Sequence, residues 1–518
     1  MIIILCINSF SGCILNEIFG TNFSLNSWRI YDDDGFPGIY VDFYCSGAIT
    51  IKTFNPNRVE LDSELFLHGN SNTTLHLGAY RETIAAGDYK LRVFDKNDNE
   101  IFEQTITVNN PKLNIFSCEQ HWWYYDNDYS LIGLTMNVYN NGEIPVYPSN
   151  YLVSIDSEIF TGYVLPCFIS PGQNDFVDFF IYSNGTPIND DFTVNIQDSS
   201  GNDLISDKFL IELENNVEDH RYNWNYNGKN RELRIPKPEF MLDYFIGLER
   251  VLYEDFSCYV FDVYDDHFLD FVINMLKDDF ESKSIADEVN FIASFVQNLE
   301  YLKDSPTNES VEYPRYPIET LFNQDGGGDC EDKAILTASL LEKSGFEVAL
   351  FRLPDHMAVG VQLGEDDSSN EYYVDNYYFL ETTTVNKPVG FIPSEHKNPS
   401  NLSVYPITKR PLIFHEWKDN VLSILRNTEL GDFVKIHVIV KNFGSKSADE
   451  VDVKAAFYTI NNVGLNIVTN TITSLDPGNK QEITLIVNIP SSISTSFITR
   501  TLFDGEITDE HTAVSDFP

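Results

Sequence analysis

The chain has 518 residues, a formal net charge of −45 and a sequence pI near 4.3. This length predicts three or four domains. The acidity argues against a nucleic-acid-binding role, because binding to phosphates needs a basic surface. Seven cysteines are too few for a disulfide scaffold, and an aromatic content of 14% favours many short strands.

Residues 1–19 are expected to form a leader. Met1–Gly12 is apolar but too short to span a membrane, and no later stretch reaches that length. Phe10-Ser11-Gly12-Cys13 resembles a lipobox, whose cysteine becomes a lipidated N-terminus. We therefore predict export to the extracellular side or the cell surface, with a lipid at Cys13 as the membrane link.

Residues 20–110 and 111–215 alternate apolar and polar positions, which predicts two β-sandwich domains. The acidic run Asp95–Asn99 lacks the glycine and the twelfth-position acid of a calcium loop, so a hairpin turn is the better interpretation. Cys118 and Cys167 fall in the same predicted domain and could pair.

A sequence pattern in the second of these domains is repeated near the C-terminus. A strand ending in Asn140-Asn141-Gly142 is followed by Pro171-Gly172, and a strand ending in Asn442-Phe443-Gly444 is followed by Pro477-Gly478. Residues 413–518 are therefore predicted to form a third β-sandwich.

Residues 216–412 have a different pattern. Helical spacing over Asp265–Phe280 and Ser284–Leu299 is followed by a third helix over Glu331–Ser344, which Gly345 would end. Short strands are expected at 347–352, at 356–363 and around Asp375 and Asn376. This mixture predicts a central α+β domain flanked by the sandwiches.

Three residues of the central domain suggest a catalytic unit. Cys330 stands at the start of the third helix, His356 follows 26 residues later, and Glu381 follows after a further 25. A helix N-terminus favours a thiolate, which is the reactive form, so we expect a lowered pKa for Cys330. His356 would act as the base, with Glu381 orienting it.

These residues lie in motifs that resemble the transglutaminase-like superfamily of papain-fold thiol enzymes, in particular archaeal secreted or lipoprotein members. The motifs are 327–334 (GGDCEDKA), Pro354-Asp355-His356 and Glu381-Thr382-Thr383. Many members carry Asp where this chain has Glu381, and Asp375 is the alternative third member. The 413–518 segment resembles adhesion-related (CARDB-like) sandwich modules of archaeal surface proteins.

Other residues near the nucleophile have two interpretations each. Gln297 is either an oxyanion donor, placed as papain-like enzymes place one, or a structural glutamine. The carboxylates of Asp325, Asp329, Glu331 and Asp332 either bind a hard cation or cap the helix, and capping is favoured. Glycines 326–328 are expected to let a substrate backbone approach closely.

Two functions follow from this pattern. The first is an exported thiol enzyme that hydrolyses amide or peptide bonds or transfers the acyl group to an amine, with a protein or peptide substrate. The second is a non-catalytic surface protein that binds cell-surface polymers or partners through its sandwiches. A metal-dependent hydrolase is disfavoured, because no His pair or CxxC spacing is present, and neither cofactor nor metal is predicted.

Overall fold

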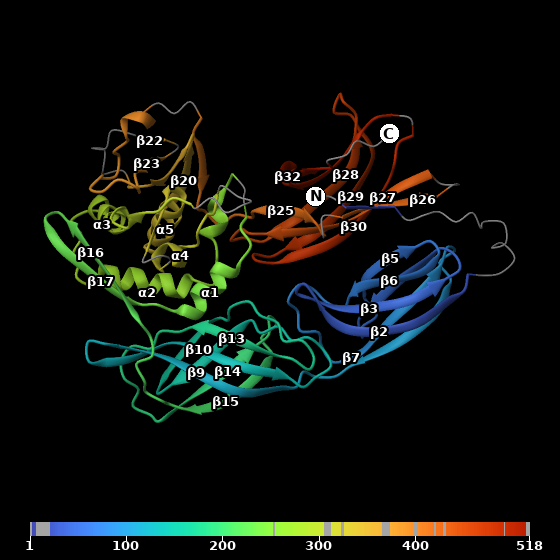
Figure 1. The fold of residues 1–518 in the computed structure, drawn as a ribbon, viewed down its shortest axis with the longest axis horizontal. Helices are drawn as coiled ribbons and strands as arrows, with labels where there is room; N and C mark the ends of the chain where they lie inside the picture. Colours follow the sequence, from blue (N-terminus) through green and yellow to red (C-terminus); the bar gives the residue numbers. More distant parts are fainter. Residues whose placement is uncertain are drawn as a thin grey trace.

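The computed structural model describes residues 3–6, 21–251, 254–304, 312–322, 326–364, 373–374, 376–397, 401–418, 421–427, 431–491 and 493–513. Three β-sandwiches flank an α+β domain that lies centrally in the sequence, so the predicted fold class is confirmed. In Figure 1 the modules form a ring, in which the blue first sandwich lies beside the orange-red third one. Among the described residues, no helix has the length and apolar character needed to cross a membrane.

The first sandwich packs a three-stranded sheet, β2-β3-β6, on a four-stranded sheet, β5-β4-β7-β8. Its strands are β2 (Phe23–Asp33), β3 (Phe36–Cys45), β4 (Ile49–Phe54), β5 (Glu60–Phe66), β6 (Gly69–His76), β7 (Gly87–Asp95) and β8 (Glu100–Val108). Asp95 accepts hydrogen bonds from the backbone N–H groups of Asn97 and Asn99, both at 2.9 Å. The acidic run is therefore the hairpin turn that the sequence predicted.

The second sandwich has the sheets β13-β10-β9 and β12-β11-β14-β15. Its strands are β9 (Leu113–Tyr125), β10 (Asp128–Asn140), β11 (Asn150–Ile155), β12 (Glu158–Tyr163), β13 (Asn174–Phe180), β14 (Asp191–Gln197) and β15 (Asp203–Leu210). Apolar side chains alternate inward along these strands and fill the space between the sheets. Cys118 and Cys167 are both free thiols, so the disulfide considered above is not present.

The third sandwich has the sheets β1-β26-β27-β25, with β30 also paired to β27, and β29-β28-β31-β32. Its strands are β25 (Ile413–Trp417), β26 (Val421–Asn427), β27 (Gly431–Asn442), β28 (Ala448–Tyr458), β29 (Gly464–Leu475), β30 (Lys480–Asn488), β31 (Ser496–Phe503) and β32 (Glu506–Thr512). Strand β1 (Ile3–Cys6) comes from the segment expected to be a leader and pairs in parallel with β26. The rest of that segment, including Cys13, lies outside the described residues.

The sequence pattern shared by the second and third sandwiches corresponds to a shared structural feature. Asn140 is buried, and its amide donates to the carbonyls of Ile144 and Ile169, at 2.7 and 2.8 Å. Asn442 is buried in the same way and donates to two carbonyls, both at 2.9 Å. Each side-chain oxygen accepts the N–H of the glycine two residues later. Each asparagine therefore joins a strand end to the turn across the sandwich.

The central domain packs helices against a five-stranded sheet, β22-β23-β21-β20-β24, with a separate hairpin, β16-β17. Its helices are α1 (Glu239–Gly247), α2 (Asp266–Lys277), α3 (Ile285–Gln297), α4 (Pro317–Phe322) and α5 (Cys330–Lys343). Its strands are β16 (Asp219–Tyr226), β17 (Lys229–Pro236), β18 (Glu300–Tyr301), β19 (Gly327–Gly328), β20 (Val348–Leu353), β21 (His356–Val361), β22 (Tyr373–Val374), β23 (Tyr377–Leu380) and β24 (Ser403–Pro406). Two short 3-10 helices are η1 (Phe256–Tyr259) and η3 (Ser394–His396).

Helix α5 is the centre of this domain. It is buried along most of its length and packs against α2, α3, α4, β20 and β21. Burial on several sides explains its apolar and small residues, and Gly345 follows its end with a φ of 85°, a conformation that glycine adopts without strain. The sequence prediction of this helix is confirmed to within one residue at each end.

Ion pairs connect the first and third sandwiches. Lys418 lies 2.8 Å from both Asp33 and Glu482, and Lys480 lies 2.5 Å from Asp34. Lys418, Asp33 and Glu482 are each at most a quarter exposed. Because such partly buried pairs are screened less than surface pairs, they help to close the ring seen in Figure 1.

Candidate active site

Cys330 is the first residue of α5, and the helix start is held by an acidic network. The carboxylate of Asp332 accepts hydrogen bonds from the backbone N–H groups of Asp329, at 3.2 Å, and Arg315, at 2.8 Å. The guanidinium of Arg315 pairs with the same carboxylate. Burial raises the pKa of Asp332 to about 7 despite this cation. The network fixes the turn that carries the thiol.

The glycines before Cys330 serve the protein's own packing. A Cβ on Gly327 would lie 2.5 Å from the carbonyl oxygen of Glu300, because β19 pairs in parallel with β18. A Cβ on Gly328 would lie 2.4 Å from the Asp332 side chain. We expected these glycines to make room for a substrate backbone. That expectation is wrong for Gly327 and Gly328, because protein atoms already occupy the space beside their Cα atoms.

His356 and Glu381 form a direct pair. Nε2 of His356 lies 3.1 Å from Oε2 of Glu381, and the glutamate side chain is 1% exposed. The other carboxylate oxygen accepts from the backbone N–H of Thr383 at 2.8 Å and from its hydroxyl. Despite burial, the hydrogen bonds from His356 and Thr383 lower the pKa of Glu381 to about 2. Glu381 is thus an ionised partner of the imidazole, while Asp375 lies outside the described residues.

The Cys330 thiol lies against the strand that begins with His356. The backbone N–H of Met357, the next residue, acts on the sulfur to lower the pKa of the thiol, but by less than burial and Glu331 raise it. The thiol itself donates to Oε2 of Glu331 at 3.2 Å. The side chain of Cys330 therefore lies between an N–H of β21 and an acidic neighbour on its own helix.

The expected lowering of the Cys330 pKa is contradicted by these surroundings. Burial raises the pKa of the thiol well above its usual range, and the carboxylate of Glu331 raises it further. Burial, together with Asp329, also raises the pKa of Glu331 to about 10. The favourable field of the helix N-terminus is outweighed, so Cys330 rests as a neutral thiol.

Gln297 lies beside this site, and its side-chain amide is hydrogen-bonded to backbone groups. Its amide nitrogen donates to the carbonyls of Glu381 and Lys387, both at 2.8 Å, and its oxygen accepts from the Lys387 N–H at 3.3 Å. Both amide hydrogens are used, which counts against the oxyanion role considered for it. Gln297 instead holds the segment that carries Glu381.

Lys333 is a buried structural residue that the sequence motif did not explain. It is 1% exposed, and its ammonium donates to the carbonyls of Gln297 and Leu299, at 3.4 and 2.7 Å. These carbonyls belong to the C-terminal end of α3, where a cation is favourable. Burial nevertheless lowers the pKa of Lys333 to about 8. Lys333 links α5 to the end of α3.

Two further residues at the site were missed by sequence reasoning. The ring of His396 stacks on the ring of His356, with centroids 4.6 Å apart and planes 5° from parallel. Tyr301 is 47% exposed on β18, and its pKa is raised to about 12 by burial and by the nearby Cys330 and Asp329 groups. No motif marks either residue, because the sheet and the 3-10 turn η3 bring them to the site from distant segments.

The acidic residues around Cys330 mainly serve to cap and brace the helix. Carboxylate oxygens of Asp329 and Glu331 lie within 4.8 Å of the Cys330 sulfur, but Glu331 accepts from the thiol and Asp332 is paired with Arg315. This agrees with the favoured capping interpretation over a hard-cation site. Asp325 lies outside the described residues.

Comparison with known proteins gives matches to solved structures alone. No family model and no curated protein matches the chain. Among solved structures, red sea bream transglutaminase is 10% identical, covers 74% of this chain and 80% of its own, and has a TM-score of 0.16. The YadV chaperone is 10% identical, covers 37% of this chain and 99% of its own, and has a TM-score of 0.14.

The fold and these contacts define a class of protein: a chain of β-sandwiches carrying an α+β domain, in which a helix that begins with a cysteine packs on a strand whose first residue, His356, pairs with Glu381.

Proposed function

We propose that the chain is an exported cell-surface thiol enzyme that acts on amide bonds in proteins or peptides. The observation that carries the proposal is the 3.1 Å contact between His356 and a buried, ionised Glu381, formed on the strand against which the Cys330 thiol lies. A buried, ionised carboxylate on the imidazole orients the ring and stabilises the positive charge that a base gains during such a reaction.

The proposed reaction begins from a neutral thiol. His356 presents Nε2 to Glu381, so Nδ1 remains to take the thiol proton. As the sulfur of Cys330 attacks the amide carbonyl, Nδ1 accepts the proton, and the imidazolium then gives it to the departing amine. A thioester remains. Water or a primary amine attacks it, loses a proton to His356, and releases an acid or a new amide with the thiol restored.

Glu381 and the start of α5 stabilise charges that develop in this reaction. The carboxylate of Glu381 faces the imidazolium, and Thr383 and Gln297 hold the glutamate in place. The backbone N–H of Cys330, at the first helical position, has no acceptor within the helix and is the proposed oxyanion donor. Such a donor contributes about 3 kcal/mol to transition-state stabilisation.

Substrate recognition is assigned to the open side of the site. Tyr301 is the exposed aromatic side chain near the nucleophile and offers a surface for a peptide segment. The choice between hydrolysis and acyl transfer depends on how well the bound substrate excludes water from the thioester.

The test uses the full chain with unfolded proteins as substrates, in the presence and absence of a labelled primary amine. Release of ammonia or peptides by the wild type, and none by Cys330→Ala or His356→Ala, supports the enzyme. Incorporation of the amine identifies acyl transfer. Release that persists in both variants contradicts the proposed nucleophile and base.

A non-catalytic binding protein is the second candidate, and one observation favours it. The thiol of Cys330 donates to Glu331 and is held neutral by burial, which is the state of an unreactive cysteine. Under this alternative, the sandwiches bind surface polymers and the central domain is a scaffold. A Cys330 whose alkylation rate does not depend on His356 would support it.

A further inference from the structure

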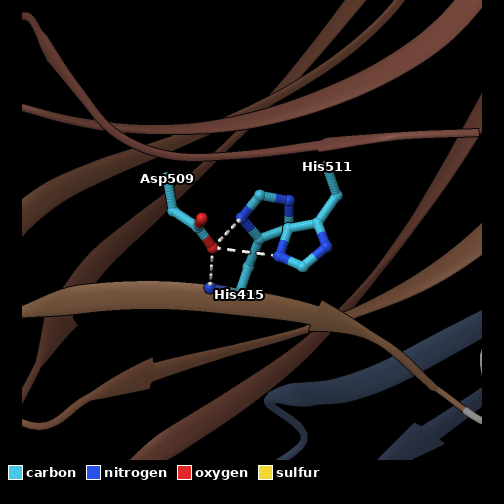
Figure 2. Close-up of side chains that lie close together, drawn as sticks. All are labelled: His415, Asp509 and His511. Atoms are coloured by element: carbon cyan, nitrogen blue, oxygen red, sulfur yellow. Dashed lines mark hydrogen bonds and ion pairs between the residues drawn. The ribbon is translucent and has the colours of Figure 1, made fainter. Parts of the chain in front are cut away.

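The third sandwich contains a second cluster of ionisable side chains, away from Cys330. His415 lies on β25, and Asp509 and His511 lie on β32. Oδ2 of Asp509 lies 3.0 Å from Nδ1 of His415 and 3.2 Å from Nε2 of His511. Figure 2 shows both rings directed at this one oxygen. The two strands belong to different sheets, so the cluster joins the two layers of the sandwich.

The cluster is buried on one side and open on the other. His415 is 1% exposed, whereas the His511 side chain is 38% exposed. Asp509 also lines an open cavity of about 390 Å³ between the third sandwich and the central domain, together with Asp255 and Arg410. An ion can therefore reach these side chains from solvent without the sandwich opening.

A second layer of hydrogen bonds orients the buried histidine. Nε2 of His415 lies 2.8 Å from the hydroxyl of Thr499, which also accepts from the indole N–H of Trp417 at 2.7 Å. In the cluster as it stands, Nδ1 of His415 faces the Asp509 carboxylate as a hydrogen-bond donor. With an ion in place of that proton, the threonine hydroxyl can accept from Nε2–H, which would leave the lone pair of Nδ1 to the ion. A histidine that binds a metal characteristically has such a partner on its other nitrogen.

We propose that His415 Nδ1, His511 Nε2 and an oxygen of Asp509 bind a divalent transition-metal ion of the zinc type, with solvent completing the coordination. Two imidazoles and one carboxylate suit such ions, whereas calcium and magnesium prefer oxygen ligands alone. Ligand atoms about 2.1 Å from a tetrahedral ion lie roughly 3.4 Å apart. The present separations of 3.0 and 3.2 Å require only a slight opening of the cluster.

The two other clusters of metal-ligating groups among the described residues do not compete with this one. Asp33, His76 and Glu482 surround the ammonium of Lys418, so a cation of the protein already lies among their carboxylates. The group formed by Asp329, Cys330 and Glu331 belongs to the active site. In the proposed site, the ion would join β25 to β32 where the chain leaves the central domain.

The test uses the full chain, stripped of metal with a chelator and titrated with Zn²⁺ by calorimetry and with Co²⁺ by visible absorption. His511→Ala removes a half-exposed ligand, and His68→Ala removes an exposed histidine elsewhere as the matched control. We expect one tight Zn²⁺ per chain in the wild type and in His68→Ala. In His511→Ala, the affinity for Zn²⁺ should fall by more than roughly 10–100-fold, which is the loss typical when a residue that only hydrogen-bonds to a ligand is replaced.

Thermal unfolding checks that the variants fold. Without metal, His511→Ala should unfold at the wild-type temperature, whereas added Zn²⁺ should raise the unfolding temperature of the wild type only. Asp509→Asn is a second variant with the same expected loss of binding. If the metal-stripped wild type binds no Zn²⁺, the proposal is overturned, and the three side chains form a hydrogen-bonded network without a metal. Equal binding by wild type and His511→Ala would place the metal elsewhere and also overturn it.

Discussion

The ring of His396 lies flat against the ring of His356, with centroids 4.6 Å apart and planes inclined by 5°. His356 is thus held on its edge by Glu381 and on one face by His396. Stacking restricts rotation of the imidazole about its Cβ–Cγ bond, which keeps Nε2 on Glu381 and Nδ1 available for the thiol. We infer that His396 is a positioning residue for the proposed base.

This relationship predicts that His396→Ala lowers the turnover number several-fold, with little change in KM, because the base becomes less well oriented. His396→Phe should restore most of the rate, because a phenyl ring preserves the stacked surface but not the titratable group. The measurement is steady-state kinetics with an unfolded protein as the amide substrate. Equal loss in both variants would indicate a proton-transfer role instead.

Removing the carboxylate beside the base should be more severe. Glu381→Gln is expected to lower the turnover number by about 10²–10⁴-fold, because the imidazolium loses its partner and the wrong tautomer is favoured. Gln297→Leu, which only loosens the support of this segment, should lose less activity. Comparable losses in the two variants would contradict the direct role of Glu381.

Glu381 also makes stability depend on pH. Its pKa is lowered to about 2 in the folded chain. A lowered carboxylate pKa stabilises the folded state above the unfolded value near 4.3, and this contribution is lost as pH falls through 2. Glu381→Gln should therefore destabilise the central domain by about 3 kcal/mol at pH 7 and by much less near pH 2. Calorimetric unfolding across this range gives the comparison.

The acidic neighbour of the thiol provides a fourth prediction. The Glu331 carboxylate opposes formation of the Cys330 thiolate, so Glu331→Gln should lower the pH midpoint of Cys330 alkylation by iodoacetamide. Glu347→Gln removes an exposed carboxylate of the same domain and is the matched control. A midpoint that moves equally in both variants would show that general charge, not this contact, sets the pKa.

The paired asparagines of the sandwiches provide a fifth prediction. Asn140→Ala and Asn442→Ala each remove the side-chain amide that donates to two carbonyl groups, so each should destabilise its own sandwich by about 1–3 kcal/mol. Asn57→Ala, at an exposed position, should have little effect. Hydrogen exchange localises each change. If hydrogen-exchange protection is also lost outside the mutated sandwich, the prediction that each asparagine stabilises its own module is contradicted.

Much of the architecture could be predicted from local sequence patterns. The period-two strands, the Asn-x-Gly turns at Asn140 and Asn442, and the helix that starts at Cys330 all depend on neighbours in the chain. The pairing of His356 with Glu381 followed from motif order. These features are encoded within short segments, so a single sequence contains their signal.

The electrostatics of the site could not be predicted in the same way. The pKa of Cys330 depends on burial and on the direction of the Glu331 side chain, and both outweigh the helix field that the sequence suggested. His396 and Gln297 acquire their partners only when distant segments meet. The hairpin of β16 and β17 was also missed, as were His415, Asp509 and His511, which come together from separate strands.

The central claim is that His356 serves as the base for the Cys330 thiol. Because burial holds that thiol neutral, its reactivity at pH 7 must depend on the imidazole. The most direct measurement is the rate of Cys330 alkylation by iodoacetamide at pH 7 in the folded full chain, followed by peptide mass spectrometry, in wild type and His356→Ala. We predict that the rate falls at least about tenfold in His356→Ala. Equal rates in the two proteins would contradict the claim.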